Sequence, residues 1–384
     1  MSGLPVNHQT IVIGAGPAGL AVGACLKQAN LPFIILEQNE KVGSAWHHHY
    51  DRLHLHTNKN SSELPFLSYP KHYPKYPSRS QIVDYLDSYA EKFRLDIRFN
   101  QQVVSAVYQN EQWEVQTQDT LHQASNLVVA SGYNREPLLP NWPGQNLFQG
   151  KILHSSQYKN GELFKGQRVL VVGFGNSGGE IAMDLWEHGV KPSISVRSAV
   201  NVIPRELFGV SILSIGILES KMPPKLADAL NAPILRAAIG DITKYGLRKL
   251  PYGPVTQIRN DVHIPLIDVG TIKLIKERYL TVCAGIKEFT QDSVKFTDEK
   301  QSKFDAVILA TGYRPGIHAF LKMDSNICSE DGVPLYSGRE TPIPGLYFCG
   351  YYVSPTGMLR EIARESKQIS KLIAERAKRV EIKK

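Results

Sequence analysis

Two stretches of the chain repeat the same order of apolar and polar positions. In residues 9–37, a short apolar run is followed by a glycine-rich turn, a helical pattern and a second apolar run, and residues 167–197 repeat this order. Continuous apolar runs of this length are typical of parallel strands buried on both faces. Each stretch therefore predicts a strand–helix–strand unit, with strands at residues 10–13, 33–36, 168–172 and 193–196 and helices at 20–30 and 180–188.

The segments around these units extend the two predicted sheets. A helix at residues 82–90 follows a candidate cap, Ser80, and the alternation at 112–117 predicts an antiparallel strand. Further buried strands are expected near residues 127–132 and 306–312.

The predicted fold class is α/β with two dinucleotide-binding (Rossmann-like) domains, the second inserted into a discontinuous first. The first domain is assigned residues 1–155 and 310–384, and the second residues 156–309. An apolar helical excursion at about residues 207–250 interrupts the second domain. Excursions of this length cover an active site or form a subunit contact, and both alternatives stay open, the latter implying a homodimer.

The first glycine-rich turn carries a dinucleotide-binding pattern. Gly14, Gly16 and Gly19 form GxGxxG, with Pro17 in the turn, after a strand and before a helix. The first glycine permits a tight turn, the second lets the backbone approach a pyrophosphate, and the third brings the helix against the strand. Glu37 ends the next strand, where a carboxylate can accept hydrogen bonds from ribose hydroxyls.

The second turn repeats the pattern, and its candidate cofactor-binding residues are Gly173, Gly175, Asn176, Ser177 and Gly178. Here the next strand ends in Arg197 instead of an acid, and Arg205 lies nearby in the sequence. An arginine can pair with a 2′-phosphate, so the pattern favours NADPH; a surface arginine with NADH as the donor is the alternative. Two such folds in one chain predict a flavin, FAD, that accepts hydride from a nicotinamide cofactor.

Charge and cysteine content bear on the partners, the redox chemistry and the location of the protein. The net charge of +8 calls for anionic partners, and two dinucleotides satisfy this without nucleic acid. Four cysteines without a CxxC pair suit a reducing compartment and disfavour a redox-active disulfide. The N-terminus does not resemble a signal peptide and no apolar run is long enough to span a bilayer, so a cytoplasmic location is expected.

A family resemblance adds the chemistry. Phe148, Gly150, His154 and Tyr158 match the FxGxxxHxxx[YW] signature of class B flavin-containing monooxygenases. Together with the two glycine patterns, the resemblance covers nearly the whole chain and is greatest to the YUCCA-type indole-3-pyruvate monooxygenases. The segments most similar to that group are residues 50–56, 63–65, 202–206 and 265–272.

The resemblance implies an FAD- and NADPH-dependent monooxygenase that uses O2 to form a C4a-(hydro)peroxyflavin and oxygenates a small organic substrate. It places Ala45, Trp46 and Gly350 beside the flavin, Val103 against its adenine, and Asn58 near the reacting atoms. The histidines within residues 47–56 then belong to a flavin-side loop, and no metal is expected.

The substrate stays open at this stage. Oxidative decarboxylation of an arylalkyl 2-oxo acid such as indole-3-pyruvate is the first hypothesis. Asn58 stands where YUCCA sequences typically have proline and resembles the asparagine of amine-oxygenating enzymes, which keeps N- or S-oxygenation as an alternative. An NADPH-flavin reductase is the second alternative.

Overall fold

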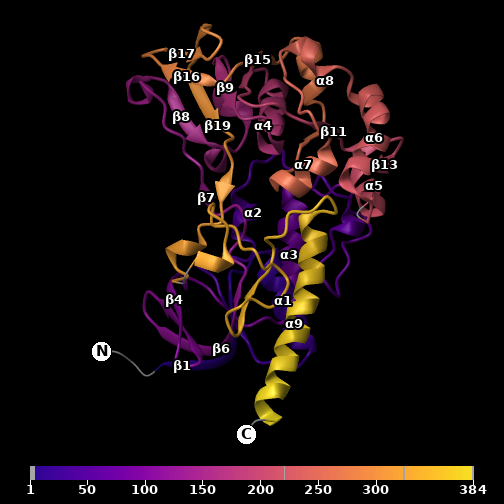
Figure 1. The fold of residues 1–384 in the computed structure, drawn as a ribbon. Coiled ribbons are helices and arrows are strands. Elements are labelled where there is room, and N and C mark those ends of the chain that lie inside the picture. The colour runs from indigo at the N-terminus through magenta and orange to yellow at the C-terminus, as the bar shows by residue number, and fades with distance from the viewer. Residues whose placement is uncertain (1–4, 220, 323–324, 383–384) are drawn as a thin grey trace.

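The computed structural model describes residues 5–219, 221–322 and 325–382 and contains two main β-sheets, each flanked by helices (Figure 1). The first sheet has the strand order β3-β2-β1-β6-β5-β4, and β21 pairs with the other side of β6 at its C-terminal end. Strands β3, β2, β1, β6 and β21 are parallel, whereas β4 and β5 form the expected antiparallel extension. The bounds are β1 Val6–Ile13, β2 Ile34–Leu36, β3 Ile97–Arg98, β4 Val103–Gln109, β5 Gln112–Thr117, β6 Leu121–Val129 and β21 Leu346–Phe348.

Helices cover this sheet and bring distant parts of the chain together. The C-terminal helix α9 (Met358–Ile382) runs along α1 (Pro17–Gln28) in Figure 1, and the two pack closely although they lie at opposite ends of the sequence. Helix α3 (Arg79–Phe93) packs on α1 as well. The first sheet therefore needs residues from both chain ends to complete its core, which confirms a discontinuous arrangement.

The second sheet is entirely parallel and has the order β15-β10-β9-β19-β8. Its central strands are apolar because both of their faces are buried. A small antiparallel sheet, β16-β17-β18, packs beside it. The bounds are β8 Lys151–His154, β9 Val169–Val172, β10 Ser193–Ser195, β15 Thr281–Cys283, β16 Ile286–Phe289, β17 Ser293–Phe296, β18 Gln301–Lys303 and β19 Ala306–Leu309, with helices α4 Asn176–Glu187 and α8 Thr271–Lys276.

Two details of the sequence interpretation are corrected. Strand β8 pairs with β19, so residues 151–154 belong to the second sheet, although the sequence placed them in the first domain. Helix α3 begins at Arg79, three residues earlier than expected, because Ser78 and not Ser80 is its cap. The Ser78 hydroxyl accepts from the Gln81 N–H, and the Gln81 side chain accepts from the Ser78 N–H.

The excursion is largely helical but opens with a hairpin. It lies at the N-terminal end of α9 in Figure 1, where the coral elements meet the yellow helix. Helix α5 approaches the loop before α9 so closely that a Cβ on Gly216 would lie 2.8 Å from the Pro355 carbonyl oxygen. Its elements and neighbours are β11 Val202–Pro204, β12 Glu206–Leu207, β13 Val210–Ser211, α5 Ile212–Glu219, α6 Pro224–Ile239, α7 Pro254–Asp261 and β14 Leu266–Asp268.

Short elements complete the connections. Strands β7 and β20 pair with each other where the chain passes between the two sheets. These elements are α2 Ser44–His48, β7 Glu136–Pro137, β20 Tyr313–Arg314, and the 3-10 turns η1 Lys59–Ser61, η2 Gln145–Leu147, η3 Ser155–Gln157, η4 Gly161–Phe164, η5 Ile242–Tyr245, η6 Ile317–Ala319 and η7 Ser325–Ile327.

Candidate active site

The two glycine-rich turns have nearly the same geometry. Gly14 and Gly173 have φ of +104° and +110°, a conformation that side chains with a Cβ rarely adopt. A Cβ on Gly19 would lie 1.8 Å from the Gly14 carbonyl oxygen, and one on Gly178 would lie 2.1 Å from that of Gly173. The first and third glycines of each turn are therefore required for the helix to meet the strand.

The middle glycines face open space. Gly16 and Gly175 precede the first turns of α1 and α4, and a Cβ on either would meet no protein atom within 4 Å. Each helix has 12 residues and no acid in its first turn, so its N–H groups and dipole favour a phosphate there. These two cradles fit the pyrophosphates of FAD and of NADPH.

Glu37 is held in a fixed orientation at the end of β2. Its carboxylate is buried and accepts from the Ala15 N–H at 2.7 Å and from the Asn39 N–H at 2.9 Å. The residue lines the same cavity as Gly14 and Gly16, where its oxygens can also accept hydrogen bonds from ribose hydroxyls.

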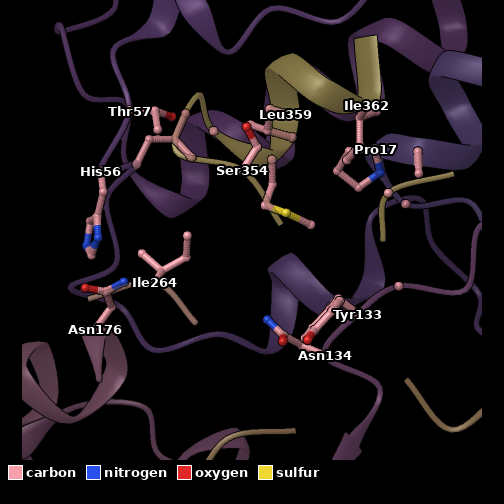
Figure 2. A pocket seen from close by; sticks show the side chains of 18 of the residues that line it. Pro17, His56, Thr57, Tyr133, Asn134, Asn176, Ile264, Ser354, Leu359 and Ile362 are labelled. Carbon is pink, nitrogen blue, oxygen red and sulfur yellow. The ribbon is translucent and has the colours of Figure 1, made fainter. Parts of the chain in front are cut away.

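One cavity of about 490 Å³ joins the two halves of the molecule. Figure 2 shows Pro17 and Ile362 on one side of this space and His56, Asn176 and Ile264 on the other. The residues proposed from the sequence that line it are Gly14, Gly16, Pro17, Glu37, Ala45, Trp46, Asn176 and Gly350. The cavity lining does not include Gly19, Asn58, Val103, Gly173, Gly175, Ser177, Gly178, Arg197 or Arg205.

Asn58 has a structural task in this arrangement. Its side-chain oxygen accepts from the Ser61 N–H at 2.9 Å and caps η1. The neighbouring residues His56 and Thr57 line the cavity instead. A catalytic role for Asn58 therefore stays a prediction, and His56 and Thr57 are the residues of this loop that the sequence interpretation missed.

Helix α4 fastens this loop to the second domain. Glu180, Asp184 and Glu187 follow each other at spacings of four and three residues and lie on one face. His56 hydrogen-bonds Glu180, and Arg52 donates to both oxygens of Glu187 at 2.8 Å. The position of His56 at the cavity thus depends on contacts across both domains.

The signature residues of the connecting segment take part in the same junction. The buried Tyr158 donates to Asp184 at 2.5 Å, and burial raises the pKa of the Tyr158 hydroxyl, which keeps it a donor. The His154 imidazole lies 3.2 Å from the Gly312 carbonyl oxygen. Both contacts are positional, as the family resemblance implies.

The end of β10 carries more positive charge than the sequence indicated. Arg197 is exposed there, and the Arg248 guanidinium donates to its carbonyl oxygen. The backbone of Val200 bridges to that of Lys249, which holds the segment of Arg248 beside the end of β10. Arg205 lies 4.3 Å over the Tyr76 ring instead. Binding of a 2′-phosphate by Arg197 or Arg205 therefore stays a prediction.

Beyond the cofactor crevice, the cavity is walled by apolar side chains from the excursion and from α9. A wall of this kind excludes water and accepts an organic molecule. Its residues include Ile203, Ile212, Ile215, Leu235, Val255, Ile258, Ile264, Ile267, Met358, Leu359 and Ile362. In the described part of the chain, no cluster of three or more histidine, cysteine, aspartate or glutamate side chains could hold a metal ion.

Two glycine-rich phosphate cradles, together with a cavity that Gly14 and Gly16 of the first and Asn176 of the second line and that has an apolar wall, are typical of a flavin- and nicotinamide-dependent oxidoreductase. Residues 11–205 match the family model of pyridine nucleotide-disulphide oxidoreductases. The chain is 40% identical over 357 residues to the probable indole-3-pyruvate monooxygenase YUCCA1 of Arabidopsis thaliana, covering 90% of this chain and 85% of the relative. It is 39% identical over 353 residues to the indole-3-pyruvate monooxygenase YUCCA1 of Oryza sativa, covering 89% and 86%.

Solved structures share the fold. A flavin-containing monooxygenase from Stenotrophomonas maltophilia superimposes with a TM-score of 0.75 at 21% identity, covering 97% of this chain and 99% of that one. An NADP+-bound cyclohexanone monooxygenase from Rhodococcus gives 0.74 at 19% identity, covering 98% and 85%. The chain belongs to the YUCCA family of flavin-containing monooxygenases. It is an FAD- and NADPH-dependent monooxygenase that uses O2 and a small-molecule substrate.

Among the described residues, we find no helix with both the length and the apolar character that crossing a membrane requires.

Proposed function

We propose that the substrate is an arylalkyl 2-oxo acid such as indole-3-pyruvate, which the enzyme converts by oxidative decarboxylation. The observation that carries this proposal is the set of residues that line the cavity. Its chamber beyond the crevice has apolar walls that suit an aromatic ring, whereas the crevice has the polar side chains of His56, Thr57, Asn134 and Asn176. The YUCCA relatives named for indole-3-pyruvate support the same substrate class.

The reaction balances with the established cofactors. The 2-oxo acid, O2, NADPH and a proton give the acid shortened by one carbon, CO2, NADP+ and water. FAD, when bound, supplies the activation of O2. The chain holds the two cofactors on the α1 and α4 cradles and keeps water from the chamber with the isoleucines of the excursion.

The test is turnover of indole-3-pyruvate with NADPH under ¹⁸O2. We expect indole-3-acetate with one ¹⁸O in its carboxyl group, one CO2 and one NADPH consumed per product. Parallel reactions with a tertiary amine and a sulfide should give little oxygenated product. Efficient amine or sulfide oxygenation without turnover of 2-oxo acids would contradict the substrate class, and NADPH oxidation without ¹⁸O in any product would favour a flavin reductase.

We further propose that the enzyme works in the cytoplasm. In support, all four cysteines are free thiols, and Cys25, Cys328 and Cys349 are buried. Free thiols persist in a reducing compartment. Imaging of a fluorescent fusion in the source cell tests this, and a signal confined to an oxidising compartment would contradict it.

A further inference from the structure

One face of α5 forms part of the chamber wall. Ile212, Ile215, Gly216 and Glu219 all line the cavity, and their spacing of three, four and seven residues places them on one side of the helix. Gly216 packs against Pro355, which also lines the cavity, so α5 lies directly over this space. Three of the four residues are apolar or small, and the fourth is a carboxylate.

Glu219 is paired with an amide from the neighbouring helix. The Asn231 Nδ2 donates to Glu219 Oε2 at 2.9 Å, and Asn231 lines the cavity from α6. Within residues 5–219, 221–322 and 325–382, Glu219 has no ion pair, and its Oε1 receives no hydrogen bond. The described cavity lining contains neither lysine nor arginine. The pair therefore presents acceptor oxygens in an apolar wall.

Asp228, an acid close to Glu219 in the sequence, has a purely structural set of hydrogen bonds and serves as a comparison. Asp228, one turn before Asn231 on α6, accepts from the N–H groups of Val255 at 2.8 Å and Thr256 at 3.0 Å and holds the start of α7. Glu219 receives no backbone N–H in the described residues. Its position suits recognition of a ligand more than support of the fold.

We propose that Glu219, oriented by Asn231, accepts a hydrogen bond from the ring N–H of the substrate and so selects indole-type over phenyl-type 2-oxo acids. The proposal rests on the substrate class proposed above. A carboxylate acceptor in an apolar wall binds a donor strongly and is left unsatisfied by an analogue that lacks one. The negative charge also directs the substrate carboxylate away from α5, toward the polar crevice.

The test compares three substrates with four proteins. The substrates are indole-3-pyruvate, 1-methylindole-3-pyruvate and phenylpyruvate; the proteins are the wild type, Glu219→Ala, Glu219→Gln and the control Glu277→Ala. Glu277 is an exposed acid in the same domain, at the end of α8 and outside the cavity lining. Its replacement removes the same charge without touching the chamber.

We expect Glu219→Ala to lower kcat/KM for indole-3-pyruvate by roughly 10- to 100-fold, the range for a hydrogen bond to a charged group. Its kcat/KM for the two substrates without a ring N–H should change less than about twofold, since neither makes that bond. Glu219→Gln keeps a neutral acceptor and should lose less, and Glu277→Ala should match the wild type. An equal loss with all three substrates would mean a structural role and would overturn the proposal.

Binding separates this inference from the proposed reaction. Indole and 1-methylindole are titrated into the oxidised, FAD-loaded enzyme, and the change in flavin absorbance gives their affinities. If the wild type turns over no 2-oxo acid, the proposed function fails, whereas a preference for indole that disappears in Glu219→Ala still supports the N–H acceptor. Equal affinities of the wild type for both ligands would overturn it.

Discussion

Gly16 and Gly175 occupy matching positions before α1 and α4, and a Cβ on either would enter open space instead of protein. Both have extended backbone conformations that alanine adopts readily. We therefore expect Gly175→Ala to change the free energy of unfolding by no more than about 1 kcal/mol. The added methyl group would displace the pyrophosphate and raise the KM for NADPH by roughly 10- to 100-fold, the cost of a lost charge-assisted bond. Steady-state kinetics and the flavin content of the purified protein measure this.

Gly178→Ala and Gly16→Ala are the controls for that prediction. A Cβ on Gly178 would lie 2.1 Å from a backbone oxygen, so this variant should lower the thermal stability of the protein. Gly16→Ala should instead reduce the flavin content and leave the second dinucleotide-binding domain intact. An unchanged KM for NADPH in Gly175→Ala would mean that α4 does not receive the NADPH phosphates.

The glycine patterns could be predicted from the sequence because their requirement is local: a turn, a close approach and a free helix end. The contacts of His56 and Arg248 and the place of Glu219 in the cavity wall could not, because each depends on a partner far away in the chain or on a wall built by separate elements. The catalytic role of Asn58 rests on a match of residue type and stays a prediction. Its side chain has a backbone donor three residues later, and only the local turn geometry reveals that use.

At the scale of elements, helix α9 packs in the core and carries a buried acid, Glu365, next to the cavity. Glu365 accepts from the Gly350 N–H at 2.7 Å, and Gly350 lines the cavity. Burial raises the pKa of Glu365 to about 7. Between its ordinary value of 4.5 and about 7, the folded protein retains a proton that the unfolded chain releases, so stability from this group falls as the pH rises through that window.

Glu365→Gln removes the titration and keeps an oxygen for the Gly350 N–H. We expect the Tm of the variant to rise relative to the wild type between pH 5 and pH 8, because only the wild type must ionise a buried acid. Thermal unfolding of the FAD-loaded proteins across this range is the measurement, with flavin content checked at each pH. Parallel Tm profiles would show that Glu365 does not titrate in this window.

The helices and strands themselves were largely predictable, because continuous apolar runs and helical spacing are features of single segments. The start of α3 was also encoded locally, since Ser78 and Gln81 form a capping box that the choice of Ser80 overlooked. Strand β8 was different. Its place in the second sheet depends on pairing with β19, some 150 residues later by their bounds, and such pairing has no local signal.

At the scale of the whole molecule, the excursion covers the cavity, as one of the two expectations from its sequence had it, and the subunit contact stays a prediction. One side of α6 faces the chamber through Asn231 and Leu235. On the remaining surface, Leu226, Leu230 and Ile234 follow at intervals of four residues and are 50%, 55% and 42% exposed. A row of this kind on a helix is a candidate contact surface, because burying it removes apolar area from water.

We predict that the row on α6 pairs with the same row of a second copy and forms a homodimer, since an isologous contact needs only one self-complementary surface. Sedimentation velocity should give the mass of two chains for the wild type and of one chain for Leu230→Glu. The control is Leu163→Glu, because Leu163 is 73% exposed in η4, outside the excursion. A wild type that remains monomeric at micromolar concentration would contradict the prediction. Dissociation with unchanged kcat would show that the outer face assembles the molecule while the inner face alone serves the chamber.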